Sequence, residues 1–534
     1  MSNNQPIPFD HIQNLLDTGQ APSARAIGSQ YLQNFPDDTS LLGLVGTACL
    51  ECGETTVALA LLEKASSREP FNVNWHWAIG RAYARCLDNA RVMPEIGDDN
   101  RLTWPAWMGR GFSALQRTTL LSPADSMPWL LLGRYAKAMG DNPTAVTCAE
   151  QILATQPDHL EALLLAAESY HYLRDQVKTE AMFERLFAVQ NDHAMGQWLH
   201  SMQLLLQGEF EQGWAAYDTR LENFGFDTTQ YPFPLPLWQG EDIAGKRILV
   251  HGEQGLGDEV MFSSIIPDLI QAGAKVTLSV SPTLAQLFLR SFADIRIYTM
   301  SRDPEAVDNW RRDAPPPNWF NAADYDFHCP NGSLPRWLRR RVENFPQQAY
   351  LQADKKLTEA FRQQIVPLDS EQPLVIGLNL TANLSTGRMG AEKTVLPYWF
   401  EFLQPLQQQG KIRVVGLQLH DMLYDSLPWV FDPRPQISNF DHTAALADAC
   451  DLIITVDTSV AHVTAALGKP TWVLLKFDAD WRFLLDTDDS PWYSDMRLFR
   501  QNEQRDWSRV VGQIQHQLEQ QLNDNNTSPD ERET

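Results

Sequence analysis

The sequence has few positive charges for its length. Its 534 residues include 43 Lys and Arg against 67 Asp and Glu, which gives a formal charge of −24. Such a chain repels a phosphate backbone and an anionic membrane surface, so we do not expect nucleic acid as a partner. It also lacks an apolar run of the roughly 18 residues that span a bilayer, and MSNNQPIPFD does not resemble a signal peptide. We therefore expect a cytoplasmic protein with no transmembrane segment.

Cysteine is also sparse. The six cysteines are scattered along a long chain, unlike the dense framework of a secreted disulfide-rich domain, so free thiols are expected. Cys49 and Cys52 form a single CxxC within a helical pattern. Metal or redox chemistry is the alternative, but without a second pair we interpret them as small core residues.

The N-terminal part repeats a pattern of small and large residues at a spacing of about 34. One copy contains Gly46, Cys49, Ala58, Leu62, Ala65 and Pro70, and another contains Trp129, Leu132, Gly133, Ala145, Ala149, Ile152 and Pro157. A third has Asn191 in place of the closing proline, a fourth is delayed by an insert near residues 88–108, and a weak copy precedes residue 38. These residues resemble tetratricopeptide repeats (TPR).

About five helix pairs would stack into an α-solenoid, because each pair leaves an apolar face that its neighbours cover. An irregular all-helical domain is the alternative. The groove of a solenoid implies a protein or peptide partner, although the fold does not identify it. The prolines at 232, 234 and 236 then end the helical pattern, and we expect the aromatic residues just before them, Phe210, Trp214 and Tyr217, to pack between modules.

From residue 247 short apolar runs alternate with helical patterns, which favours parallel sheets. The expected strands are Arg247–His251, Lys275–Val280, Ile295–Thr299, Leu374–Asn379, Arg413–Gln418, Leu452–Val456 and Thr471–Leu475. An irregular region, Ser301–Pro346, separates two groups, so two Rossmann-like lobes fit best. Ligands of such sheets bind beyond the carboxyl ends of the strands.

The first strand is followed by a loop with Glu253, Gly255, Gly257 and Asp258. Its glycines have no side chain, so a neighbouring group or ligand can approach the loop backbone closely. Their spacing does not match GxGxxG, which disfavours a nicotinamide enzyme, and the Lys-Ser or Lys-Thr of a Walker loop is missing.

A later strand ends at Val456, and Asp457, Thr458, Ser459, Val460 and His462 follow it. We expect a helix here, capped by Thr458 or Ser459, whose first amides and positive dipole end suit a diphosphate. This chemistry fits a nucleotide-sugar donor.

Further motifs lie in the same half of the chain. They are Gly257-Asp258, Lys393 with Pro397, Asp457-Thr458-Ser459 with His462, Trp481-Arg482, Ser490-Pro491-Trp492-Tyr493 and Arg497-Leu498-Phe499-Arg500-Gln501. In this order they resemble heptosyltransferase-like glycosyltransferases (family nine, GT-B fold), in the bacterial branch with N-terminal TPR that includes flagellin-modifying enzymes.

The resemblance implies that Asp258 is the general base and that Lys393 neutralises the donor phosphate. It also implies that Thr458, Ser459 and Val460 bind the diphosphate, that Asp457 orients their turn, and that His462 lies one helical turn inside it. Gln418 ends an expected strand, so we expect it to face the cleft. No metal and no cofactor are implied, since the nucleotide-sugar is a substrate. Asn379 departs from the family, where an aromatic residue is usual, so the donor base or sugar can differ.

Each role has a structural alternative. Asp258 is also the kind of residue that charges the first turn of a helix. His462 fits a hydrogen-bonded core histidine equally well, and Glu253 fits a packed or exposed acid as well as a second catalytic acid. Trp492 and Tyr493, like Trp481, fit the core better than a sugar platform.

The expected architecture is therefore an α-solenoid followed by an α/β domain with twin Rossmann-like lobes. Its expected parts are a TPR domain (1–205), a connecting segment (206–240), an acceptor lobe (241–350), a donor lobe with a C-terminal helix (351–522) and a disordered tail (523–534). The predicted function is transfer of a sugar from a nucleotide-sugar to a protein such as flagellin. The alternatives are transfer to lipopolysaccharide or another glycan, and a non-catalytic adaptor.

Overall fold

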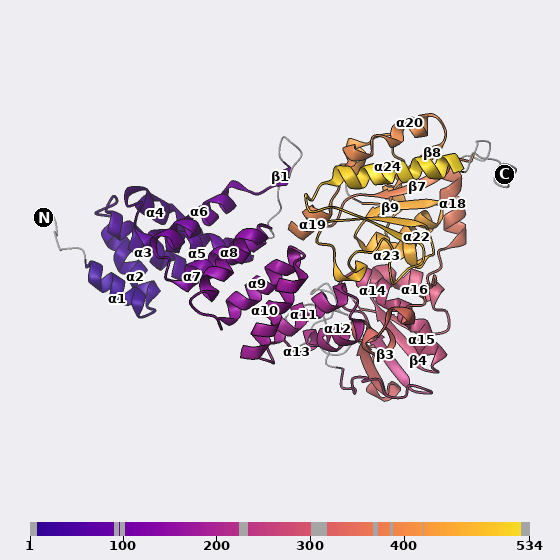
Figure 1. Cartoon of the computed structure of the whole chain (residues 1–534), viewed down its shortest axis with the longest axis horizontal. Coiled ribbons are helices and arrows are strands. Elements are labelled where there is room, and N and C mark those ends of the chain that lie inside the picture. Colours follow the sequence, from indigo (N-terminus) through magenta and orange to yellow (C-terminus); the bar gives the residue numbers. More distant parts are fainter. Residues whose placement is uncertain are drawn as a thin grey trace. The chain divides into compact units, whose positions relative to one another are not determined.

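The computed structural model describes residues 8–89, 95–96, 102–223, 233–300, 318–366, 372–384, 388–419 and 421–524. The chain divides into two compact units (Figure 1), Met1–Asn191 with Leu384–Ala391, and Asp192–Asn383 with Glu392–Thr534. The domain limits proposed from the sequence stay predictions. Of the expected tail (523–534), residues 525–534 lie outside the described residues, and residues 523 and 524 are the last of a helix.

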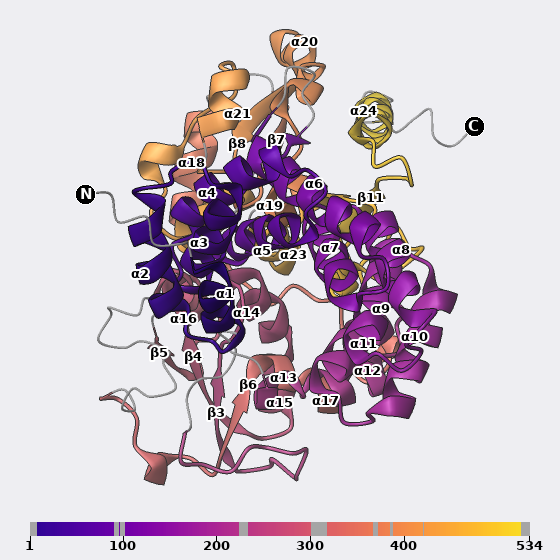
Figure 2. The ribbon, with the colours of Figure 1, turned by 90° about the vertical axis from the view of Figure 1, so that its left-hand side faces the viewer.

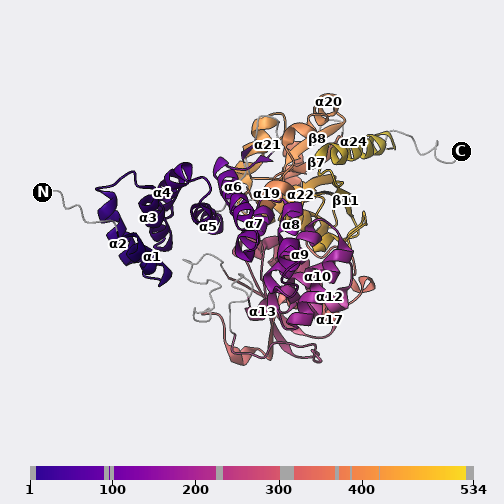
Figure 3. The same ribbon diagram turned by 60° about the vertical axis from the view of Figure 1, so that its left-hand side comes forward.

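The first unit is an α-solenoid of antiparallel helix pairs, and Figure 3 shows α1 to α4 as consecutive neighbours. Its helices are α1 (Phe9–Asp17), α2 (Ala21–Leu32), α3 (Thr39–Glu51), α4 (Thr55–Arg68), α5 (Val73–Asn89), α6 (Ala106–Leu121), α7 (Ser126–Ala138), α8 (Asn142–Leu153), α9 (Leu160–Tyr172) and α10 (Gln176–Val189). The short strands β1 (Glu95–Ile96) and β2 (Leu102–Thr103) lie in the expected insert between α5 and α6.

Small residues at the repeat positions let these helices approach closely. A Cβ atom on Gly46 of α3 would lie 2.8 Å from Cγ of Leu62 in α4, and one on Gly133 of α7 would lie 2.6 Å from Cδ2 of Leu165 in α9. Cys49 is buried in the same core, and the six cysteines form no disulfide, as expected. The repeat pattern read from the sequence therefore corresponds to the helix contacts.

The second unit begins with helices α11 (Ala194–Leu206), α12 (Phe210–Tyr217) and α13 (Arg220–Asn223). The ring of Trp214 in α12 packs edge-on against Trp481 and Trp492, at centroid distances of 5.3 and 6.4 Å, and its Nε1 donates to the carbonyl oxygen of Arg339 at 3.0 Å. These aromatic residues are packing residues, as the sequence indicated.

A four-stranded parallel sheet follows, in the order β5-β4-β3-β6 (Figure 2). Its strands are β3 (Arg247–His251), β4 (Lys275–Val280), β5 (Arg296–Thr299) and β6 (Phe327–Pro330), and its helices are α14 (Leu256–Phe262), α15 (Ile266–Gln271), α16 (Ala285–Ser291) and α17 (Pro335–Leu338). The expectation that residues 301–346 are irregular throughout was wrong, because β6 pairs with β3. A four-residue strand that ends in proline gives no clear periodic signal, and the edge position of β6 tolerates the missing N–H.

The second sheet has five parallel strands in the order β11-β10-β9-β7-β8. They are β7 (Leu374–Asn379), β8 (Ile412–Gly416), β9 (Leu452–Val456), β10 (Thr471–Leu475) and β11 (Met496–Arg500). The accompanying helices are α18 (Lys355–Ile365), α19 (Arg388–Lys393), α20 (Leu403–Gln408), α21 (Asp421–Ser426), α22 (Phe440–Asp448), α23 (Ser459–Ala466) and α24 (Trp507–Asp524). The sequence did not predict β11, where arginines interrupt the apolar residues.

One hydrophobic core contains residues from both sheets, including Val250 of β3 and Val473 of β10. The C-terminal helix α24 packs against the second sheet. Its buried residues, Val510 and Ile514 among them, share a core with Ile376 of β7 and Phe499 of β11. No helix of the described part of the chain is long and apolar enough to span a membrane.

Candidate active site

The loop after β3 places Asp258 in the first turn of α14. Gly255 is the N-cap residue, and its backbone N–H donates to Oδ2 of Asp258 at 2.7 Å. Gly255 and Gly257 do not have positive φ angles. They matter because a side chain at either position would collide with neighbouring atoms. A Cβ atom on Gly255 would lie 2.9 Å from Oδ2 of Asp258. The structural alternative for Asp258, an acidic residue in the first turn of a helix, is therefore present in the structure.

The other carboxylate oxygen of Asp258 faces the second sheet. Nη2 of Arg482 donates to Oδ1 of Asp258 at 2.5 Å, and only 12% of the Arg482 side chain and 16% of the Asp258 side chain are exposed. Arg482 lies in a 3-10 helix, η9 (Trp481–Phe483), beyond the carboxyl end of β10. An ion pair thus connects the loops that follow β3 and β10.

Arg482 is held by a second carboxylate. Its Nη1 and backbone N–H donate to Oδ1 of Asp480 at 2.7 and 3.0 Å. Burial alone would raise the pKa of Asp480, but the charges of Arg482 and Lys393 outweigh it and the pKa is lowered. Nη2 of Arg482 also donates to Oε1 of Gln254 at 3.2 Å. Sequence reasoning gave none of these three residues a role, although Arg482 belonged to a quoted motif.

Helix α23 starts directly beside α14. Ser459 is its first residue, and its Cα lies 3.4 Å from the position that a Cβ atom on Gly257 would take. Thr458 occupies the N-cap position, but its side chain makes no cap hydrogen bond, so the expected hydroxyl cap by Thr458 was wrong. Its Oγ1 instead accepts a hydrogen bond from Nδ2 of Asn379 at 2.9 Å, and the same nitrogen donates to Oγ1 of Thr455 at 2.9 Å. Asn379, which departs from the family pattern, therefore links the end of β7 to the start of α23.

Lys393 and Asp457 form an ion pair of 2.5 Å, with Lys393 at the end of α19 and Asp457 directly after β9. Burial alone would lower the pKa of Lys393, but the carboxylates of Asp457 and Asp480 outweigh it and the pKa is raised. The ammonium group is therefore charged. Two cations, Lys393 and Arg482, thus lie near the start of α23.

His462 is buried one turn into α23. Its Nδ1 lies 3.1 Å from Oη of Tyr493, and burial lowers its pKa. The ring also packs closely on the loop after β3, because a Cβ atom on Gly257 would lie 3.0 Å from its Cδ2. Val460, one residue into the helix, is 9% exposed. Of the two interpretations of His462, the hydrogen-bonded core histidine describes its surroundings.

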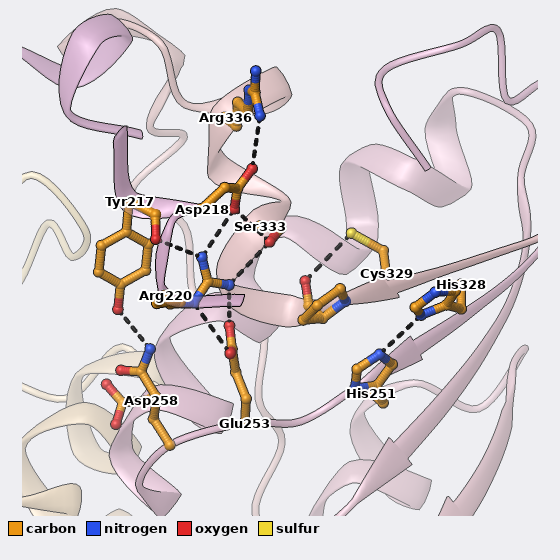
Figure 4. Close-up of polar contacts among 12 residues, drawn as sticks. Tyr217, Asp218, Arg220, His251, Glu253, Asp258, His328, Cys329, Ser333 and Arg336 are labelled. Carbon is orange, nitrogen blue, oxygen red and sulfur yellow. Dashed lines mark hydrogen bonds and ion pairs between the residues drawn. The ribbon is translucent and has the colours of Figure 1, made fainter. Parts of the chain in front are cut away.

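Glu253 is a buried packing residue. Figure 4 shows the guanidinium of Arg220 between Glu253, Asp218 and Ser333. Nε of Arg220 donates to Oε2 of Glu253 at 3.2 Å, and its Nη1 donates to Oδ1 of Asp218 at 2.9 Å. Burial raises the pKa of Glu253 although Arg220 opposes this shift. The ion pair fixes the loop after β3 to α13, so the loop that carries Asp258 is anchored.

Gln418 lies two residues beyond β8 and is 5% exposed. Its Oε1 accepts from the backbone N–H of Leu380 at 2.9 Å, and its Nε2 donates to Oγ1 of Thr381 at 3.1 Å. These bonds hold the segment that follows β7. A contact with a donor stays a prediction.

Comparisons with known proteins give two matches to the sequence. Residues 436–474, which contain β9, α23 and most of β10, match the family described as Glycosyltransferase family 9 (heptosyltransferase). Over 425 residues the chain is 27% identical to Protein FlbA of Caulobacter vibrioides, and the match covers 74% of this chain and 67% of FlbA. The chain is a helical-repeat protein with a heptosyltransferase-like glycosyltransferase domain.

Several solved structures are similar to this chain. One is YrrB, described as a TPR protein with an unusual peptide-binding site. It is 17% identical, with a TM-score of 0.31, over 37% of this chain and 91% of YrrB. TTC0263, a thermophilic TPR protein of Thermus thermophilus, is 18% identical, with a TM-score of 0.26, over 37% of this chain and 97% of TTC0263. The solenoid assignment itself rests on the helix pairs and on the residues between them.

Proposed function

We propose that this glycosyltransferase moves a sugar from a nucleotide-sugar donor to a protein acceptor recruited by the repeats. The two parallel sheets are the lobes of a GT-B enzyme, the first on the acceptor side and the second on the donor side. The observation that carries the proposal is that Asp258 pairs with Arg482 while its neighbour Gly257 contacts the start of α23. A carboxylate is thereby placed beside a helix start and two cations.

In this proposal the donor diphosphate binds at the first turn of α23, where the dipole is positive and Thr458 leaves the amides uncapped by its side chain. Lys393 supplies positive charge for the leaving diphosphate. Asp457 holds Lys393 in place for this step. The reaction uses no metal and no cofactor.

Asp258 then acts as the general base. It takes the proton from the acceptor hydroxyl as the oxygen attacks the anomeric carbon, the bond from that carbon to the diphosphate breaks, and the nucleotide leaves with the electron pair. Proton transfer of this kind contributes roughly 10²–10⁴-fold to the rate. The hydroxyl must reach Asp258 on a lone pair that Gly255 and Arg482 do not use, and about two of the roughly four acceptor sites of a carboxylate remain.

The acceptor is a protein, because stacked helical repeats in general form concave surfaces that bind proteins or peptides, and such repeats accompany the transfer domain. Flagellin or another bacterial surface protein is the proposed acceptor, modified in the cytoplasm. The test is intact-mass measurement of surface proteins from cells with and without the gene, combined with nucleotide release by the purified chain from a panel of activated sugars. A mass difference of whole sugar residues supports the proposal. Silence with every donor and no mass difference would favour a non-catalytic adaptor, and a change confined to lipopolysaccharide would favour glycan transfer.

A further inference from the structure

Two arginines connect loops and helices of the first sheet with those of the second. Arg482 of η9 pairs with Asp258 of α14, and Arg290 of α16 pairs with Asp441 of α22, where its Nη2 lies 3.0 Å from Oδ2. Both pairs are largely buried, since 28% of the Arg290 side chain is exposed against 12% for Arg482. Only the first pair includes a residue of the candidate site.

We propose that Arg482 is a positioning residue, which orients the carboxylate of Asp258 for proton transfer. This inference rests on the proposed function. Asp258, the base, follows a strand of the first sheet, whereas Arg482 follows a strand of the second sheet, on the donor side. The donor side therefore acts directly on the base. The base is therefore correctly placed only while the loop after β10 lies against the loop after β3.

The geometry of the carboxylate supports this role. The hydrogen bond from Gly255 to Oδ2 comes from the same loop as Asp258 and holds one carboxylate oxygen. The bond from Arg482 holds the other oxygen, Oδ1, so the orientation of the carboxylate is restrained from both sheets. Displacement of a reacting group by about 1 Å can cost roughly 10²-fold in rate, so this restraint has consequences for turnover.

Arg482 is itself fixed in several ways, as a positioning residue must be. Asp480 accepts from both its side chain and its backbone, and its guanidinium lies 4.2 Å from the centre of the Trp481 ring. That ring packs on Trp214 and on Tyr217, whose Oη accepts a hydrogen bond from Nε2 of Gln254 at 2.6 Å. Gln254 has a φ of +60°, a conformation that costs a residue other than glycine about 1 kcal/mol or more. The loop that contains Gln254 and the side chain of Arg482 are thus held by the same contacts.

The experiment compares R482Q and R482K with R290Q, in the full-length chain. R290Q is the matched control, because it also removes an Arg–Asp pair between the two sheets but leaves Asp258 untouched. With a donor that wild-type protein turns over, R482Q should lower kcat about 100-fold with little change in the KM of the donor. R482K, which keeps the charge but not the planar fork, should restore part of kcat, and R290Q should behave as wild type.

Three results would overturn the inference. They are an equal loss of kcat in R290Q and R482Q, an unchanged kcat in R482Q, and a rise in donor KM without a fall in kcat, which would make Arg482 a phosphate ligand. Crystal structures of wild type and R482Q provide a readout that needs no activity. The Asp258 carboxylate should turn away from its wild-type orientation in R482Q, and an unchanged orientation would refute the role of Arg482. If the wild-type protein turns over none of the donors, this result would instead count against the proposed function. The crystal structures would still decide the role of Arg482.

Discussion

Gly257 lies in α14, beside the first sheet, and Ser459 lies in α23, beside the second. A Cβ atom on Gly257 would nevertheless lie only 3.4 Å from the Cα of Ser459 and 3.0 Å from Cδ2 of His462. The missing side chain thus lets α14 approach the start of α23 closely. This approach places Asp258, the next residue, beside the proposed diphosphate site.

Replacement of Gly257 by valine should separate the two helices. We expect a destabilisation of about 1–3 kcal/mol from overpacking, and a loss of nucleotide release larger than that destabilisation explains. Thermal unfolding and donor turnover measure the two effects. The control is Gly109→Ala in α6, where nothing lies within 4 Å of an added Cβ, and which should be neutral or slightly stabilising. Wild-type turnover in Gly257→Val would contradict the importance of this contact.

Asp258→Asn should retain the fold and lose turnover. The amide oxygen can still accept the hydrogen bond from Gly255, but the side chain no longer takes a proton, so kcat should fall by roughly 10²–10⁴ with donor affinity nearly unchanged. Steady-state kinetics and nucleotide binding test this. Asp326→Asn, which removes the pairing of Asp326 with Arg247 in the same sheet, is the control and should leave kcat unchanged. An unaffected rate in Asp258→Asn would remove Asp258 as the base.

Lys393→Gln should weaken donor binding. Loss of a hydrogen bond to a charged group costs about 1.5–3 kcal/mol, so the donor KM should rise roughly 10- to 100-fold. Lys393→Arg should lose less, because arginine keeps the charge that the phosphate requires. If both variants bind the donor as the wild type does, Lys393 serves only to pair with Asp457.

The sequence predicted the strands that are buried on both faces, such as Leu452–Val456, because a continuous apolar run is a strong signal. It also predicted the helix pairs, since small residues recur where helices touch. It missed β6 and β11, which are short or interrupted by charge. For the candidate site, the family resemblance pointed to Asp258 and Lys393, and their roles stay predictions. The pairs that these residues form with Arg482 and Asp457 come from distant segments. Such pairings depend on tertiary structure and leave no local pattern.

Glu253→Gln should destabilise the chain strongly. The side chains of Arg220 and Glu253 are 1% and 0% exposed, and breaking a buried ion pair by removing one charge costs about 3–5 kcal/mol. The pairing of Arg220 with Asp218 keeps the expected loss near the lower value. Denaturant unfolding measures it, with Glu211→Gln as the control, because its pair with Arg340 is about half exposed. A change below about 0.5 kcal/mol in Glu253→Gln, the range of ordinary surface substitutions, would show that the anchor is dispensable.

Two stacked histidines on neighbouring strands should make stability depend on pH. Nε2 of His251 lies 3.2 Å from Nδ1 of His328, and burial lowers the pKa of His328 from 6.5 to about 4. The unfolded chain therefore binds more protons than the folded chain between pH 4 and pH 6.5.

The free energy of unfolding should therefore be highest, as far as His328 is concerned, above pH 6.5. It should decrease as the pH falls toward 4, by up to about 2 kcal/mol after allowance for partial exposure. Urea unfolding at a series of pH values should show a shallower loss for His328→Asn than for wild type, whereas His516→Gln, an exposed position on α24, should follow the wild type. Parallel curves for His328→Asn and wild type would mean that the histidine pair does not resist protonation.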